Sequence, residues 1–244
     1  MGIKDIIGFL ASATSILLQL SPLPEVINAL RKRDIKNLTI SYFMGGICQT
    51  LFWIGYGVCI NDMYVLVPNI TLAFLFGFYM NSAIYIKKQY NLFYILNPII
   101  IIGVYLILKF CPEHLCDSMA TIISIIWQST NSLTMRLALK YRDSAYINLL
   151  VSFVSWLNMG LFWIYSLMIG AYIMFIPNIY GFSINSINMY LYFWACGYFS
   201  ENNCFINILK IILKPDKLES DNTNQVHNDN IDYDTTKEDF INKI

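Results

Sequence analysis

Charge is scarce in this sequence of 244 residues. Asp, Glu, Lys and Arg make up only 13% of it, about half the share of a soluble domain, whereas 57% of the residues are hydrophobic and 16% are aromatic. The run from Ser144 to Ser200 contains no charged residue, and it is far longer than the roughly 20 residues that cross a bilayer. A soluble protein is therefore excluded, and this run alone holds at least two helices back to back.

Other absences exclude classes of function. No ionisable side chain is expected well inside an apolar stretch, which argues against proton-coupled pumps, channels with charged rings and enzymes with a buried acid or base. The sequence has no P-loop motif and no basic cluster interleaved with aromatics, so neither ATP-driven transport nor nucleic-acid binding is indicated. We expect no enzyme and no cofactor.

The loop around Cys111 and Cys116 is the one place where the sequence suggests that a metal site or a disulfide be considered. A metal site is disfavoured, because these two thiols and His114 are too few ligands. A disulfide between the two cysteines and a pair of free thiols both remain open.

Seven apolar stretches are long enough to cross a membrane. They are continuously apolar and do not alternate, so they predict helices and not a barrel. The fold class expected is an all-α membrane protein with transmembrane helices at about Ile6 to Val26, Leu38 to Ile60, Tyr64 to Ile86, Leu92 to Phe110, Met119 to Leu139, Ile147 to Ile169 and Tyr172 to Phe199.

The distribution of Lys and Arg predicts the orientation. Twelve of these residues fall on one side of the expected membrane, and Lys4 and Lys109 fall on the other. This places the N-terminus outside and the C-terminus in the cytosol, with the plasma membrane as the default location. Residues 201–215 repeat apolar side chains at helical spacing, which predicts an interfacial amphipathic helix, and the acidic segment 216–244 is expected to be disordered.

The chain repeats itself with a shift of 109 positions. Pro68-Asn69-Ile70 then meets Pro177-Asn178-Ile179, and Gln19 meets Gln128. Transporters are commonly built from such repeats. We expect a first triple-helix bundle at 5–88, a linker helix with an outer loop at 89–116 and a second bundle at 117–200. Because a single helix joins the two copies, they enter the membrane in the same direction and are parallel.

Several short motifs in this order resemble one family. Ser21-Pro22-Leu23-Pro24 closes the first span, Trp53-Ile54-Gly55-Tyr56-Gly57 lies in the second, and the asparagine Asn69 lies in the third. Over about residues 5 to 198 the chain resembles the SWEET sugar transporters of eukaryotes. The resemblance implies gradient-driven, bidirectional transport of a neutral mono- or disaccharide by alternating access between two triple-helix bundles. It also implies self-association into a homo-oligomer in the lipid membrane.

The resemblance further implies a substrate site. The family's paired pore asparagines correspond to Asn69 and Asn178, and its central aromatic pair corresponds to Trp53 and Phe162, or to Trp163 if the register is one residue out. One helical turn earlier, the family's pocket residues correspond to Gln49 and Asn158.

The chain departs from the family at its hinges. Four prolines are expected around the route, and only Pro22 fits; the other three positions hold Tyr42, Asn131 and Asn148. Hinge motion is therefore a weaker expectation than the fold. Two glycines expected after Asn69 are also replaced, by Ile70 and Leu72.

The chemistry of the two asparagines supports a sugar site independently of the family. An amide inside lipid is costly without partners, and it offers the donors and the acceptor that a polyhydroxylated solute needs. An aromatic face suits the C–H face of a pyranose. The alternative is that the amides hold helices together. Two other functions stay open: a related PQ-loop carrier of amino acids or small metabolites, and a non-transporting receptor or scaffold.

Overall fold

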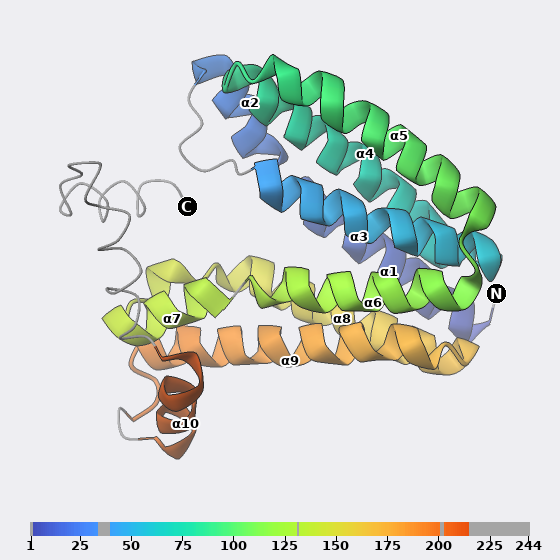
Figure 1. Ribbon diagram of the computed structural model, residues 1–244. Helices are drawn as coiled ribbons and strands as arrows, with labels where there is room; N and C mark the ends of the chain where they lie inside the picture. The colour runs from blue at the N-terminus through green and yellow to red at the C-terminus, as the bar shows by residue number, and fades with distance from the viewer. Residues whose placement is uncertain (1, 34–39, 131, 201–202, 215–244) are drawn as a thin grey trace. The chain divides into compact units, whose positions relative to one another are not determined.

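The computed structural model describes residues 2–33, 40–130, 132–200 and 203–214 (Figure 1). These residues form helices and contain no strand, which confirms the all-α fold class. The helices are α1 (Ile3–Leu20), α2 (Leu23–Lys32), α3 (Ile40–Cys59), α4 (Met63–Ile86), α5 (Tyr90–Phe110), α6 (Glu113–Ser129), α7 (Ser132–Tyr141), the 3-10 turn η1 (Ser144–Tyr146), α8 (Leu149–Ile169), α9 (Tyr172–Ala195) and α10 (Cys204–Leu213).

The helix boundaries repeat with the same shift as the sequence motifs. Both ends of α4 move onto the ends of α9, and the start of α3 moves onto the start of α8. The gap between α1 and α2 likewise moves onto the gap between α6 and α7. The internal repeat is therefore a repeat of helices as well as of motifs, and we call residues 3–86 the first repeat and residues 112–195 the second.

The first and fifth predicted spans differ from the structure, because each is two helices and not one. α1 gives way to α2 at Ser21 and Pro22, and α2 then continues to Lys32, beyond the predicted end of the span. A proline has no N–H to donate and its ring displaces the preceding turn, so it ends one helix while fitting the first turn of the next. α2 ends where Arg33 adopts a left-handed conformation with φ of 55°.

Each of the seven predicted spans coincides with one helix or one such pair of helices. Four segments of the described chain are long and apolar enough to cross a membrane: Ile3–Lys32, Met63–Ile86, Tyr90–Phe110 and Leu149–Ile169. α6 falls short in length, with 17 residues, and α9 carries three asparagines, Asn178, Asn185 and Asn188. These apolar helices make the chain an integral membrane protein.

Two compact units divide the contacts of the chain. The first comprises Met1–Gln128 with Val154–Phe182, and the second comprises Ser129–Phe153 with Ser183–Ile244. In the first unit α4 packs against α1, α2, α3 and α5, and Figure 1 shows α3, α4 and α5 running alongside one another. Leu51, Phe76 and Tyr79 belong to the apolar core between α2, α3 and α4.

The second unit has its own core. α7 packs against α10, and the side chains of Leu139, Leu191, Trp194, Ile206 and Leu209 are buried together. α10 thus lies where the sequence predicts an interfacial helix, although its place at a membrane surface stays a prediction. So does the division into triple-helix bundles, and the tail 216–244 lies outside the described residues.

Candidate functional site

A proline interrupts the backbone hydrogen bonds of one helix in each repeat. Pro68 inside α4 and Pro177 inside α9 have no N–H, so the carbonyls of Tyr64 and Ile173 lose their usual partner four residues later. An unpaired carbonyl is costly away from water. Each is therefore expected to find a donor from a neighbouring helix.

A hydroxyl from the first helix of each repeat provides this donor. Ser12 Oγ on α1 lies 2.7 Å from the Tyr64 carbonyl oxygen, and 2.8 Å from the Gly8 carbonyl of its own helix. Thr121 on α6 donates to the Ile173 carbonyl over a longer distance of 3.4 Å. Ser12 and Thr121 occupy equivalent positions of the two repeats, as do the two carbonyls. The repair of the proline break is therefore itself part of the repeat.

The asparagine after each proline makes the same contact in both repeats. Asn69 Nδ2 donates to the Val65 carbonyl, and Asn178 Nδ2 donates to the Met174 carbonyl, each at 2.7 Å. Both side chains are half-buried. Since an amide nitrogen carries two hydrogens, each asparagine keeps one N–H and its Oδ1 oxygen outside the contacts that the described residues provide. Both amides are held in place and still have bonding capacity to offer.

The aromatic residues predicted for the site share one apolar cluster. Trp53 is buried in it, and Phe162 packs against it. Val65 and Met174, whose carbonyls hold the two asparagines, are members of the same cluster. Hence the two Pro–Asn motifs and the predicted aromatic pair lie around one group of side chains in the first unit.

Trp53 has a fixed orientation within this cluster. Its Nε1–H donates to Ser124 Oγ on α6 over 3.0 Å, and its ring meets that of Tyr56 edge-on at 5.8 Å between centroids. Phe162 stands at the equivalent position of the second repeat and has no N–H to donate. The two repeats thus present an indole and a phenyl ring.

Trp163 contacts different rings. It packs against Phe175 and Phe182 of α9 at centroid distances of 5.9 and 5.6 Å, and its buried Nε1 has no acceptor among the described residues. The register that the helix boundaries follow pairs Trp53 with Phe162. This favours Phe162 over Trp163 as the second aromatic residue of the site.

Gln49 and Asn158 are equivalent in register but not in their contacts. Asn158 is buried, and its Nδ2 donates to Ala11 O and to Thr14 Oγ1 on α1, both at 2.9 Å. Gln49 is half-buried, and its Oε1 has no donor among the described residues. The amide hydrogens of Asn158 are therefore used between helices, whereas Gln49 keeps a buried acceptor.

Gln128 is a buried polar residue that the motifs did not assign to the site. Its Nε2 donates to the Pro177 carbonyl at 3.3 Å, directly before Asn178, and its Oε1 has no donor within the described part of the chain. The side chain fits there because residue 181 is glycine. A Cβ atom at Gly181 would lie only 2.2 Å from Gln128 Oε1. The match of Gln19 with Gln128 was the sequence signal that could have found it.

A tyrosine and two acids lie near the ends of the predicted spans. Tyr165 Oη donates to the carboxylate of Asp62, which also caps the N-terminus of α4. Asp117, just outside its predicted span, is 7% exposed, and burial raises the pKa of its carboxyl group. Asp117 stands two residues before the predicted fifth span, and no motif in the sequence marked it as buried.

The cysteine loop holds free thiols. Cys116 is fully buried and its Sγ donates to the Cys111 carbonyl at 3.8 Å, with no disulfide formed. Burial raises the pKa of the Cys116 thiol to about 12, so it is protonated and unreactive at neutral pH. In the described ranges no group of three or more His, Cys, Asp or Glu side chains is arranged to hold a metal ion.

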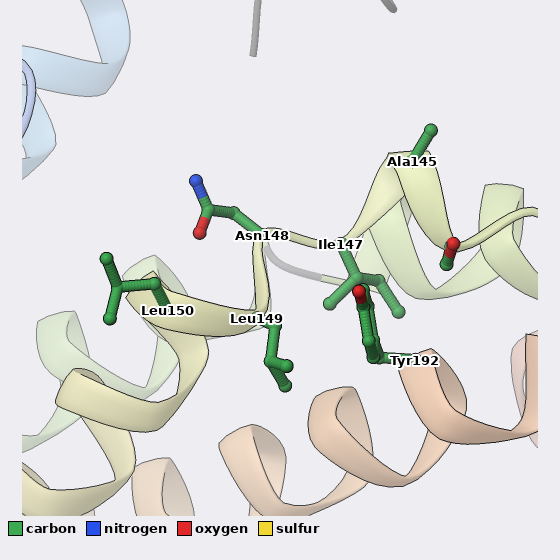
Figure 2. A pocket seen from close by; sticks show the side chains of 7 residues that line it. Ala145, Ile147, Asn148, Leu149, Leu150 and Tyr192 are labelled. Carbon is green, nitrogen blue, oxygen red and sulfur yellow. The ribbon is translucent and has the colours of Figure 1, made fainter. Parts of the chain in front are cut away.

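A hollow of about 430 Å³ lies in the second unit (Figure 2). It is lined by η1, the start of α8 and Tyr192 of α9, and Asn148 is its one side-chain amide. None of the residues predicted for the substrate site lines it. Asn148 accepts from the Val151 N–H at 3.0 Å and so caps α8, which is a structural role.

Comparison with known proteins relates both sequence and fold to one family. Residues 5–91 match the family described as a sugar efflux transporter for intercellular exchange. The fold is similar to that of a eukaryotic SWEET transporter determined at 3.7 Å resolution, with a TM-score of 0.70 and 15% sequence identity over 80% of this chain and 100% of that chain. No curated protein matches the chain. These findings confirm the resemblance to the SWEET family, whose members are transporters and not enzymes.

Proposed function

We propose that this SWEET-like chain carries neutral sugars across a membrane, down their gradient and in both directions. The observation that carries the proposal is the duplicated Pro–Asn motif. In each repeat a hydroxyl meets the carbonyl freed by the proline, and the adjacent asparagine is held by one amide hydrogen. Helix packing alone would not require the same arrangement twice in the same register.

The proposed substrate site combines amides with aromatic faces. Asn69 and Asn178 each offer an acceptor oxygen and one remaining N–H, which suit sugar hydroxyls because a hydroxyl both donates and accepts. Trp53 and Phe162 supply ring faces for the C–H face of the sugar. Gln49 adds a buried acceptor, and Asn158 supports the site by holding α8 against α1. Charged solutes are disfavoured, because none of these side chains is ionisable.

The mechanism we propose is alternating access between two triple-helix bundles. Each repeat has a helix break at the same register, between α1 and α2 and between α6 and α7, and Pro22 lies at the first break. Such breaks let one half of a span tilt while the other half stays packed. The uncoupled character follows from the absence of ionisable residues among the proposed site residues.

Uptake of labelled sugars into cells that lack sugar transport of their own tests this proposal. We expect uptake of glucose or a related neutral sugar, insensitive to a protonophore, with accelerated exchange when the opposite side is preloaded. Uptake of amino acids in place of sugars would indicate a carrier of the PQ-loop type. No transport of any solute, with surface expression confirmed, would contradict the proposal and favour a receptor or scaffold.

We further propose that the N-terminus faces outside and the C-terminus the cytosol, in the plasma membrane, because Lys and Arg concentrate on one side. An epitope tag placed after Ile244 should bind antibody only after the cells are permeabilised. Binding of the antibody to intact cells would show that the C-terminus faces outside, which is the opposite orientation.

A further inference from the structure

A polar stripe on α6 contacts residues of the proposed sugar site and the helix that carries one of them. Thr121, Ser124 and Gln128 follow one another at spacings of three and four residues, so they share one face of the helix, and all three are buried. Thr121 donates to the Ile173 carbonyl of α9, and Ser124 accepts from the indole N–H of Trp53. The face of α6 that carries Gln128 is therefore the face that meets the site.

Gln128 extends these contacts to the second asparagine. Its Nε2 donates at 3.3 Å to the carbonyl of Pro177, which belongs to the peptide bond that leads into Asn178. Its Oε1 lies against α9 at Gly181, where an added Cβ atom would overlap with it. Asn178 and Gly181 are three residues apart and are therefore neighbours on the surface of α9. The Gln128 amide is thus held beside the turn of α9 that carries Asn178.

The oxygen of this amide has no hydrogen-bond donor among the described residues, although the Gln128 side chain is only 7% exposed. An amide oxygen can accept two hydrogen bonds, and a buried one that accepts none is costly and calls for an explanation. A hydroxyl group that arrives with the substrate would supply the missing donor.

The equivalent glutamine of the first repeat has different surroundings. Gln19 occupies the same register on α1, but its side chain is only half-buried. The residue of α4 that corresponds to Gly181 is Leu72, which is buried in the core of the first repeat. The position after the Pro–Asn motif thus holds a leucine in the first repeat and leaves room for an amide in the second.

We propose that Gln128 is a specificity-determining residue for the sugar, because its Oε1 accepts a hydrogen bond from one substrate hydroxyl while Asn178 binds a neighbouring one. This inference rests on the proposed function and adds a contact within the same site. The bond from Nε2 to the Pro177 carbonyl fixes the orientation of the amide. A solute without that hydroxyl leaves Oε1 unpaired in a buried place and is rejected for this reason.

The test compares glucose with its monodeoxyfluoro analogues as competitors of labelled glucose uptake, in cells that lack sugar transport of their own. Fluorine is similar in size to a hydroxyl group but cannot donate a hydrogen bond. In the natural protein, the analogue without the donor to Oε1 should bind about five- to hundredfold more weakly than glucose. In Gln128→Met, glucose itself should lose this factor, and the difference between glucose and that analogue should shrink to less than about twofold.

Two variants separate this contact from a role in helix packing. Gln128→Glu keeps an acceptor oxygen at the same reach and should retain the discrimination between glucose and the analogue. Gln19→Met changes the equivalent residue of the first repeat and should leave the discrimination of the natural protein intact. If Gln128→Met does not reach the cell surface, Gln128→Asn decides by the same ratio, because its shorter side chain withdraws the oxygen.

Three results would overturn the inference while leaving the proposed sugar transport intact. The first is an unchanged ratio of glucose to analogue affinity when Gln128 loses its oxygen, since all sugars would then be affected alike. The second is an equal loss of discrimination in Gln19→Met, and the third is a natural protein that discriminates against none of the analogues. Absence of uptake of any sugar by the natural protein would instead overturn the proposed function and this inference together.

Discussion

Ser12 in the first repeat and Thr121 in the second make the same kind of contact, whereas Trp53 and its equivalent Phe162 do not. Both hydroxyls meet a carbonyl that a proline leaves without a partner, at 2.7 and 3.4 Å. In contrast, Trp53 is bonded to Ser124, but its equivalent Phe162 has no group to bond with. The two repeats thus share the contacts that satisfy the backbone at the proline breaks, whereas this contact between two side chains occurs in the first repeat alone among the described residues.

The same asymmetry holds at two further pairs of positions. Leu72 is buried in the core of the first repeat, whereas its equivalent Gly181 leaves room for Gln128. Gly8 is close-packed under two tyrosine rings, whereas its equivalent Asp117 is a buried carboxyl group. At both positions the second repeat buries a polar side chain, Gln128 or Asp117, where the first repeat buries leucine or packs glycine against tyrosine rings.

The largest effect is expected from giving the second repeat the residue of the first at position 181. In Gly181→Leu, the new side chain would occupy the place of the Gln128 amide, since even a Cβ atom would lie 2.2 Å from Gln128 Oε1. Overpacking of this kind costs about 1 to 3 kcal/mol or more. We expect a fall of several degrees in the melting temperature and severe loss of transport.

Gly77→Leu is the matched control, because a Cβ atom at Gly77 of α4 meets no atom within 4 Å. It should retain nearly normal stability. Equal loss in both variants would mean that leucine in an apolar helix, and not the Gln128 contact, is responsible.

The next effect tests the repair of the proline breaks. Ser12→Ala removes a donor to the Tyr64 carbonyl and should destabilise by about 0.6 to 1.7 kcal/mol, the range for hydrogen bonds between membrane helices. Thr121→Val should cost less, because its bond is longer. Thermal unfolding in detergent measures both.

A double-mutant cycle sharpens this test. In a Pro68→Ala background, residue 68 regains an N–H for the Tyr64 carbonyl, so Ser12→Ala should then cost little. An unchanged cost of Ser12→Ala in that background would show that Ser12 serves some other contact, such as its bond to the Gly8 carbonyl.

A smaller effect should follow from making the aromatic pair symmetric. Trp53→Phe deletes the N–H that donates to Ser124 and gives the first repeat the phenyl ring of the second. We expect a loss of about 0.6 kcal/mol in stability and a modest rise in the KM for sugar. Ser124→Ala should have the same effect on stability, and the double variant should add nothing further. Additive losses would show that the two side chains act independently.

The smallest effect concerns pH. Burial raises the pKa of Asp117, so in the folded protein the charged form is disfavoured. Above this raised pKa the ionised carboxylate opposes folding, and below the pKa of the unfolded chain both states are protonated. Asp117→Asn should therefore melt higher than the natural protein at pH 7, and the difference should shrink as the pH falls below the folded pKa and vanish below the pKa of the unfolded chain. Glu113→Gln, which changes an exposed acid in the same helix, is the control. If the difference in melting temperature between Asp117→Asn and the natural protein grew as the pH fell, the predicted direction of the pH effect would be wrong.

Much of the fold was predictable from the sequence, because lipid demands long apolar helices and these are visible as uncharged runs. Seven spans and the shift that relates the two repeats were read from the chain, and the helix boundaries follow both. The break between α6 and α7 was not predicted, since no proline marks Ser129 and Thr130. The different hydrogen bonding of Gln49 and Asn158 could not be predicted either, because Ala11 and Thr14, which accept from Asn158, are far from it in sequence.

The most direct test of the account is sugar uptake by Asn69→Ala and Asn178→Ala, each normalised to the amount of protein at the cell surface. Loss of a buried hydrogen bond costs about 1 to 3 kcal/mol, which corresponds to roughly a five- to hundredfold loss of binding. We predict that each change reduces uptake per molecule by about this factor, while Asn185→Ala in the same helix as Asn178 leaves it nearly normal. Normal uptake per molecule by both variants, with any loss confined to folding or surface expression, would mean that the two asparagines only hold helices together.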